Sequence, residues 1–143
     1  MTAQEILKLI EEVSPDDTAK LDEIDARVMT YLEGWEFKDY ARMYNEERTH
    51  AFTLEEGEIL FTVHFTRSRD ALKQIRPEGW RLSVDGIAWV GVETKKNISQ
   101  DKFACSLLNW KRDAFVNSYG LPTEELAELH AIIKAIEYER NNA

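Results

Sequence analysis

Apolar residues recur every three or four positions near the start of the chain, which predicts amphipathic helices there. The first predicted helix opens with Thr2 and Glu5, whose spacing fits a capping box, and ends near Ser14. Its apolar stripe is Ile6, Leu9, Ile10 and Val13. A second helix is predicted after Thr18, with Gly34 as its C-cap. Its apolar face is Leu21, Ile24, Val28, Tyr31 and Leu32, and its opposite face is Asp22, Glu23, Asp25 and Arg27.

The end of the chain carries the strongest helix signal. Thr123 follows Pro122 as an N-cap, and Glu124 and Glu125 occupy the first turn, where carboxylates favour the positive end of the helix dipole. The apolar stripe is Leu126, Leu129, Ile133 and Ile136. We expect the tail, residues 139–143, to be frayed.

The middle of the chain reads as strands. Residues 35–58 show neither a helical nor a strand period and are read as a loop or an irregular strand, whereas residues 59–65 alternate as a strand with its odd-numbered residues on one side. Ser68 caps a short helix that Pro77 ends. Further strands are predicted at residues 80–84 and 87–92, joined by an Asp85-Gly86 hairpin turn, and at 103–108 and 114–118, joined by the polar turn 109–113.

Together these elements predict an α+β fold with an antiparallel meander of about four to five strands. A chain of 143 residues fits one domain, 1–143. Hydrophobic residues make up 43% and charged residues 31%, a globular composition without repeats or low-complexity tracts.

Three motifs resemble the phage ABA-sandwich domain family, small proteins of phages and prophages. Residues 21–29 look like its opening helix, residues 65–82 like its central helix and turn, and residues 120–126 like the start of its closing helix. Pro77-Glu78-Gly79-Trp80 is the most specific piece. The resemblance implies an α-β-α sandwich over about residues 21–137, with residues 1–15 as an N-terminal helical extension and a charged insert at 39–58. The family brings no established active site.

Charge divides the chain into an acidic start, a basic middle and an acidic end. The net charge is −9, yet residues 59–120 hold ten basic and six acidic residues. The acidic surface disfavours duplex nucleic acid as a partner. Cys105 is the single cysteine, and no stretch reads as a secretory signal or a membrane span, so we expect a cytoplasmic protein.

Catalytic and metal signatures are missing from the sequence, so we assign no catalytic residue, metal or cofactor. His64 and Thr66 match one half of a paired His-x-Thr phosphate site, and we read His64 as a half-buried strand residue. Cys105 lies on the predicted core side of a strand, which favours a small buried hydrophobe over a nucleophile. His130 is expected to pack at the edge of the core.

The remaining constellation is basic and aromatic. Arginine and tryptophan together suit both phosphate or base recognition and protein interface hot spots. Trp80 also fits a core position, whereas Trp110, in a turn, is the better candidate for exposure. The candidate binding residues are Arg67, Arg69, Trp80, Arg81, Trp110, Lys111 and Arg112.

These observations favour two function classes, and a third, an enzyme of unrecognised type, stays open and would require polar groups with perturbed pKa values gathered in a cleft. The first is a phage or prophage accessory protein that binds a host protein, for example to block a defence or regulatory system, and that uses its acidic helices against a basic surface. The second is a protein that sequesters a nucleotide-type ligand, which requires Arg67, Arg81 and Trp80 or Trp110 to converge in one pocket. Homodimerisation is open to either, because small antiparallel sheets must protect their edges.

Overall fold

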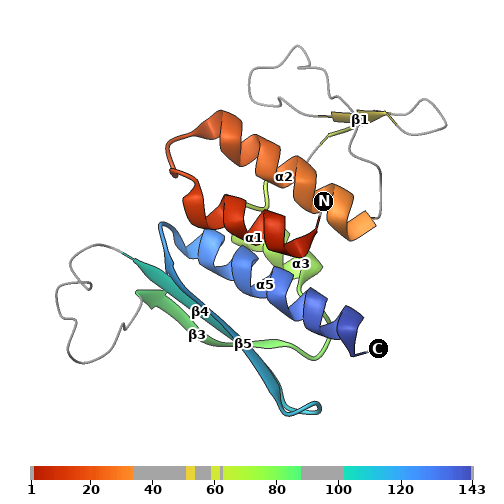
Figure 1. Ribbon diagram of the computed structural model, residues 1–143, viewed down its shortest axis with the longest axis vertical. Coiled ribbons are helices and arrows are strands. Elements are labelled where there is room, and N and C mark those ends of the chain that lie inside the picture. Colours follow the sequence, from red (N-terminus) through yellow and green to blue (C-terminus); the bar gives the residue numbers. More distant parts are fainter. Residues whose placement is uncertain (1, 34–50, 54–58, 62, 88–101, 143) are drawn as a thin grey trace. The chain divides into compact units, whose positions relative to one another are not determined.

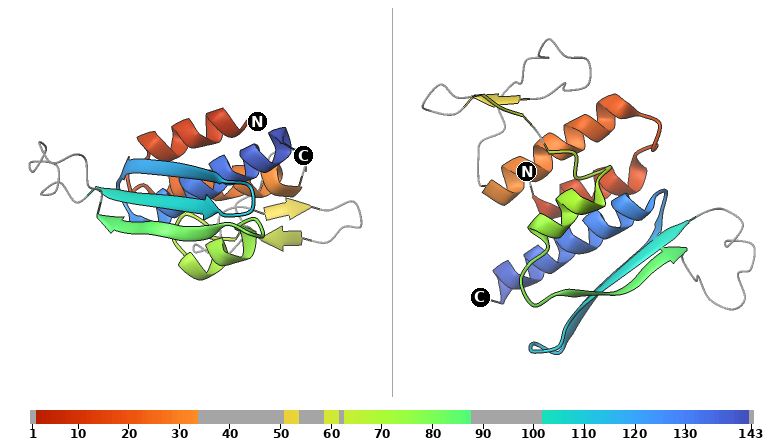
Figure 2. Two further views of the ribbon diagram at one scale, coloured as in Figure 1. Left: turned by 90° about the horizontal axis from the view of Figure 1, so that it is seen from below. Right: turned by 180° about the vertical axis from the view of Figure 1, so that it is seen from behind.

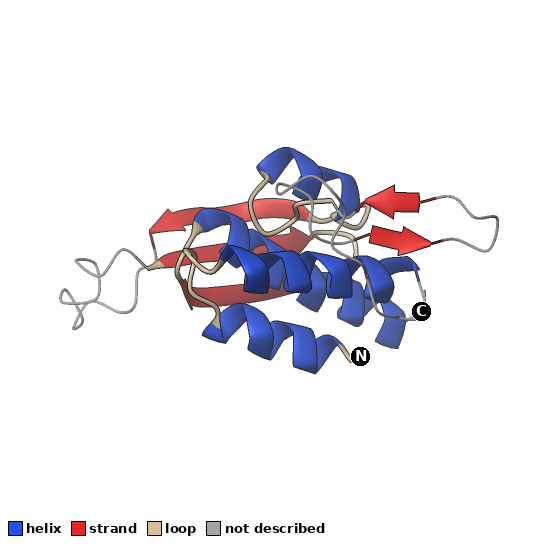
Figure 3. Ribbon diagram, turned by 90° about the horizontal axis from the view of Figure 1, so that it is seen from above, coloured by secondary structure: helices blue, strands red, loops and turns tan. Residues whose placement is uncertain are grey.

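The computed structural model describes residues 2–33, 51–53, 59–61, 63–87 and 102–142. These residues confirm an α+β protein, with four helices, a two-stranded sheet and a three-stranded antiparallel sheet in the described part of the chain (Figures 1 and 3). The chain divides into two compact units, Met1–Thr66 and Arg67–Ala143. The single domain predicted over residues 1–143 stays a prediction.

The first unit opens with two packed helices, α1 (Ala3–Glu12) and α2 (Thr18–Glu33), as predicted. The Glu5 N–H donates to Thr2 Oγ1 at 3.3 Å, which confirms Thr2 as the N-cap of α1. The predicted C-cap of α2, Gly34, lies outside the described residues. Apolar burial follows the predicted stripes, since Ile6, Ile10 and Ile24 are fully buried.

The predicted polar face of α2 is not a solvent-exposed surface. Asp22 and Asp25 are 2% and 0% exposed. Asp25 accepts hydrogen bonds from the Thr66 backbone N–H at 2.8 Å and from Thr66 Oγ1 at 3.2 Å. A buried carboxylate is tolerated where such donors satisfy it. Asp25 therefore fastens the chain at Thr66 to α2 within the first unit.

The same unit contains a short antiparallel pair, β1 (Ala51–Thr53) and β2 (Ile59–Phe61). The sequence did not separate β1 from the irregular segment around it, most of which lies outside the described residues. The strand predicted over residues 59–65 is confirmed only as far as Phe61. Val63 is 38% exposed and Phe65 is 4% exposed, so these two side chains do not share one face as predicted.

The second unit is built on the sheet β3 (Arg81–Ile87), β4 (Phe103–Asn109) and β5 (Ala114–Leu121), in the order β3-β4-β5. The predicted Asp85-Gly86 hairpin turn is wrong. Asp85 pairs with Cys105 and Gly86 pairs with Ala104, so both residues lie inside β3. The strand predicted to follow, residues 87–92, lies outside the described residues beyond Ile87.

One face of this sheet is covered by α5 (Glu124–Asn141), against which α3 (Arg69–Ile75) packs (Figure 2). Ser68 and Thr123 cap the two helices as predicted, each accepting from the backbone N–H three residues on. The expected fraying of residues 139–143 is wrong for the described part of the tail, because α5 continues to Asn141. The end of α5 helps to form the site described next.

Candidate functional site

The Pro77-Glu78-Gly79-Trp80 turn places its tryptophan in the core of the second unit. Gly79 has φ +89°, a conformation that suits glycine, and the Trp80 N–H donates to the Pro77 carbonyl. The Trp80 side chain is 3% exposed and meets the Tyr138 ring edge to face at 5.6 Å. Its Nε1 donates to Glu139 Oε1 at 2.7 Å. The indole is thus used to join β3 to the end of α5.

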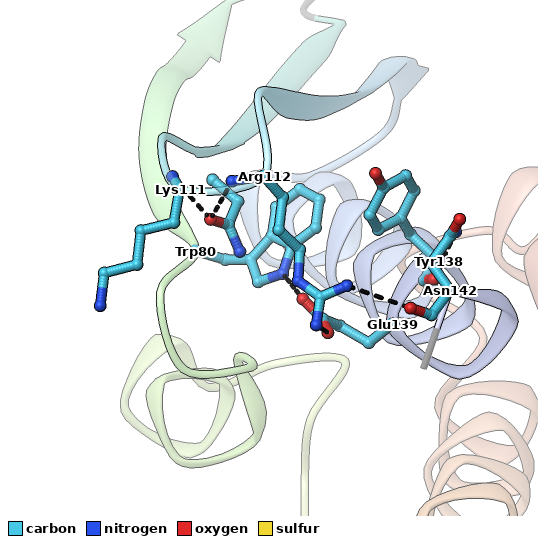
Figure 4. Close-up of polar contacts among 7 residues, drawn as sticks. Trp80, Lys111, Arg112, Tyr138, Glu139 and Asn142 are labelled. Atoms are coloured by element: carbon cyan, nitrogen blue, oxygen red, sulfur yellow. Dashed lines mark hydrogen bonds and ion pairs between the residues drawn. The ribbon is translucent and has the colours of Figure 1, made fainter.

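Arg112 reaches the same carboxylate from the turn between β4 and β5 (Figure 4). Its guanidinium lies 3.1 Å from Glu139 Oε2 and donates to the Asn142 carbonyl at 3.4 Å. A cation is favourable at the C-terminal end of a helix, where unpaired carbonyls concentrate negative charge. Glu139 therefore joins Trp80 and Arg112.

The β4–β5 turn is held by Asn109, a 5% exposed residue at the end of β4. Its Oδ1 accepts from the backbone N–H groups of Lys111 and Arg112, at 3.1 and 3.3 Å. Such side-chain bonds to the following backbone stabilise tight turns. The result is an ordered turn that leaves Trp110 77% exposed, as the sequence predicted, with Lys111 also exposed.

The other predicted arginines lie elsewhere. Arg69 contacts Glu124 and Glu128 at 3.2 Å each, near the start of α5, and Arg67 is half-buried just before α3. Glu128 holds Arg69, and Glu139 holds Trp80 and Arg112. These two carboxylates are eleven residues apart on α5, or about 16 Å at 1.5 Å per residue. Arg81 is exposed at the first position of β3.

Two further aromatic side chains on β5 were missed from the sequence. Phe115 is 61% exposed and Tyr119 is 57% exposed. They share one face of the strand, because side chains alternate along it, and Leu108 lies opposite Phe115 on β4. We name β4, the turn 110–113 and β5 the aromatic hairpin. Phe115 and Tyr119 are four residues apart, a spacing that puts both side chains on one face of a strand, and this signal was available in the sequence.

The opposite face of β5 carries a buried polar contact under α5. Ser118 Oγ lies 2.6 Å from His130 Nδ1, and the two residues are 1% and 3% exposed. Cys105, the register partner of Ser118, is fully buried, which agrees with the prediction that it is a small core residue. Burial separates this contact from solvent, so we assign it to fixing α5 on the sheet.

The His64-x-Thr66 pattern likewise has a structural role. Thr66 is hydrogen-bonded to Asp25, and His64 precedes it in a non-strand segment. Within the described ranges, no group of three or more His, Cys, Asp or Glu side chains could hold a metal ion. Among the helices that the structure describes, none combines the length and the apolar character that crossing a membrane requires.

Comparison with models of protein families, with curated proteins and with solved structures gave no match. The resemblance to the phage ABA-sandwich family therefore stays a prediction. The arrangement of side chains is what bears on function, and it concentrates exposed aromatic groups on the aromatic hairpin.

Proposed function

We propose that this protein acts by binding another protein through the aromatic hairpin. The observation that carries the proposal is the exposure of Trp110, Phe115 and Tyr119, from 57% to 77%, within one hairpin. Tryptophan and tyrosine are the residues most enriched in interface hot spots, because they bury large rigid surfaces at low entropic cost. A scattered exposed apolar residue needs no such role, but three aromatic side chains within ten residues favour one.

The charge around the hairpin indicates the chemistry of the partner. Lys111 and Arg112 follow Trp110, with Arg112 paired to Glu139 and Lys111 exposed, and Arg81 lies opposite Leu108 in the sheet. A complementary surface would offer an apolar pocket with an acidic rim. The acidic helices are a weaker candidate for the contact than the sequence suggested, because Asp22 and Asp25 are buried.

The small-ligand alternative gains little from the described contacts. It requires arginine and tryptophan side chains to converge on one pocket. Trp80 is buried against Glu139, whereas Arg69 is held by Glu124 and Glu128 at the other end of α5. Trp80 and Arg69 are thus engaged in internal contacts, whereas Arg81 and Trp110 are exposed.

The phage origin and the sandwich fold predicted from the sequence belong to the same proposal. We place the protein among phage or prophage accessory proteins that bind a host protein in the host cytoplasm, for example an inhibitor of a defence or regulatory system. We also propose that the sheet belongs to an α-β-α sandwich of four to five strands, of the phage ABA-sandwich type. The resemblance around Pro77 to Trp80 supports both statements.

The test is quantitative affinity capture from host cells with the wild-type protein and two tryptophan variants. Trp110→Ala removes the exposed indole, and Trp80→Phe replaces the buried indole with a smaller ring that has no donor for Glu139. We expect a host protein to be enriched by the wild type and by Trp80→Phe, and lost with Trp110→Ala. Titration of the purified partner should then show at least tenfold weaker binding by Trp110→Ala.

Native mass spectrometry of the same preparations separates the two function classes. A co-purified polypeptide released in stoichiometric amount supports the proposal. A small molecule that stays bound to Trp110→Ala and is released only on denaturation would support the ligand-binding alternative instead.

A further inference from the structure

The turn between β4 and β5, residues 110–113, is connected to the end of α5 through one side chain. Within the described part of the chain, Arg112 is the turn residue whose side chain binds another element. Trp110 is 77% exposed, and Lys111 and Asp113 are exposed as well. In Figure 4 the Lys111 side chain extends away from Glu139, whereas the Arg112 side chain reaches it.

The Glu139 carboxylate is shared between this turn and the core of the second unit. Its Oε1 accepts from Trp80 Nε1 at 2.7 Å, and its Oε2 lies 3.1 Å from Arg112 Nη2. The Trp80 side chain is 3% exposed, so the indole holds the carboxylate in one place. Pairs between two mobile surface side chains are weak partly because both must be ordered. Here one member of the pair is already fixed, so less entropy opposes the contact.

The backbone of the turn is held from within the hairpin. Asn109 Oδ1 accepts from the N–H groups of Lys111 and Arg112, and the Asp113 N–H donates to the Trp110 carbonyl at 3.4 Å. Asp113 has φ +50°, an uncommon conformation for a residue with a side chain. Such conformations persist where the surrounding contacts hold them. The Arg112 side chain supplies a contact of this kind from outside the hairpin.

We infer that Glu139 is a positioning residue for Trp110. Through Arg112 it holds the turn in the conformation that presents the exposed indole to a partner. The inference rests on the proposed function, since it concerns how the same hairpin binds. A binding segment that is ordered beforehand loses less conformational entropy in the complex, which raises affinity. The end of α5 thus sets how well the aromatic hairpin binds.

The first experiment measures NMR relaxation of the backbone amides of residues 110–113 in the free protein. Glu139→Gln keeps an oxygen acceptor for Trp80 but removes the charge that pairs with Arg112, and Arg112→Met removes the cation. We expect both variants to lower the order parameters of the turn from about 0.85, the value of rigid backbone, towards about 0.6. Glu125→Gln makes the same change of charge in the first turn of α5 and should leave them unchanged.

Two further variants separate positioning from general support of the fold. Ile133→Val shortens a fully buried side chain of α5, so it should lower the urea midpoint without loosening the turn. Arg112→Lys keeps a cation for Glu139 and should recover part of the order that Arg112→Met loses. A turn that loosens equally in Ile133→Val would assign Glu139 to general stability and overturn the inference.

A double-mutant cycle then tests whether Glu139 acts through Arg112, with the partner identified by affinity capture. Glu139→Gln and Arg112→Met should each weaken binding about fivefold. The double variant should bind no more weakly than either single variant, because both changes break the same contact. Losses that add would show that Glu139 acts by another route, which overturns the inference.

The inference and the proposed function fail in different measurements. Wild-type order parameters in both Glu139→Gln and Arg112→Met overturn the inference, as does unchanged affinity in variants whose turn is loosened. Either result leaves binding through Trp110 standing. Failure of Trp110→Ala to weaken binding overturns the proposed function instead.

Discussion

At the scale of single residues, Arg69 and Glu128 form the contact with the largest expected effect on stability. The Glu128 side chain is 2% exposed, and Arg69 lies 3.2 Å from its Oε1. Its Oε2 has no hydrogen-bond partner among the described residues. Removing one partner of a buried pair leaves an uncompensated charge, so Arg69→Ala should lower the free energy of unfolding by about 3 kcal/mol.

Urea unfolding measures this loss, and two further variants complete the experiment. Lys73→Ala, which removes an exposed side chain of α3, should cost less than about 0.5 kcal/mol. The double variant Arg69→Met with Glu128→Leu should recover most of the stability, because it removes both charges. Equal losses in Arg69→Ala and Lys73→Ala would contradict the assignment.

Glu23 on α2 gives a prediction about acid stability. Partial burial acts to raise the pKa of Glu23, but hydrogen bonds from Lys20 and Arg27 outweigh it, so the pKa lies below the ordinary 4.5. A lowered folded-state pKa contributes stability above pH 4.5, and this is lost as the pH falls through the folded value. Because helix-surface pairs are weak, Glu23→Gln should cost about 0.5–1 kcal/mol at pH 7.

Urea midpoints at pH 7 and pH 3 provide the measurement, and the cost of Glu23→Gln should shrink between them. Glu12→Gln on α1 controls for the change in net charge. A cost that grows at low pH would have the wrong sign for a carboxylate with a lowered pKa.

At the scale of elements, substitutions at two glycines test how closely the turn before β3 approaches the end of β4. Gly79 and Gly120 both have positive φ, +89° and +72°. A Cβ at Gly79 would lie 3.3 Å from Asn109 Nδ2, whereas a Cβ at Gly120 would meet nothing within 4 Å. Backbone strain applies to both, at about 1–2 kcal/mol for an L-residue, and crowding applies to Gly79 alone.

We therefore expect Gly79→Ala to destabilise the protein more than Gly120→Ala in thermal unfolding. The extra cost should decrease in an Asn109→Ala background, since a double-mutant cycle isolates their contact. If the costs of Gly79→Ala and Asn109→Ala simply add in the double variant, the protein relieves the close approach of residues 79 and 109 in another way.

Local signals predicted the helices well, and a local signal also produced the main error. Thr2, Ser68 and Thr123 cap their helices because an N-cap depends on residues only three positions away. Asp85-Gly86 has the composition of a hairpin turn, yet pairing with Cys105 and Ala104 on β4 places it within a strand. Turn composition is a preference that a long antiparallel ladder outweighs.

Contacts between distant elements account for what the sequence could not specify. Trp80 meets Glu139, 59 residues along the chain, and this contact decides that its indole is buried rather than available to a ligand. It also explains why α5 stays helical where fraying was expected. The exposure of Trp110 was predictable, because a tryptophan in a short polar turn has little core to enter.

At the scale of the whole molecule, the aromatic hairpin is basic within a chain of net charge −9. Because Arg112 is paired with Glu139, the exposed Lys111 is the residue that sets the local potential of the hairpin turn against the sign of the protein as a whole. In protein complexes, exposed rim charges act mainly on the rate of association, whereas buried aromatic anchors act mainly on the rate of dissociation. The hairpin places both kinds of group within three consecutive residues.

The last prediction follows from this separation. With the partner identified by affinity capture, Lys111→Glu should slow association about tenfold at low salt and change dissociation little, and the difference should disappear by about 0.5 M salt. Trp110→Ala should leave association nearly unchanged and speed dissociation at least tenfold, at any salt concentration. Surface plasmon resonance resolves the two rates, and Lys73→Glu, a charge reversal on α3, is the matched control. If Lys111→Glu and Lys73→Glu slow association equally, net charge governs the encounter, and the hairpin is not where the partner first meets the protein.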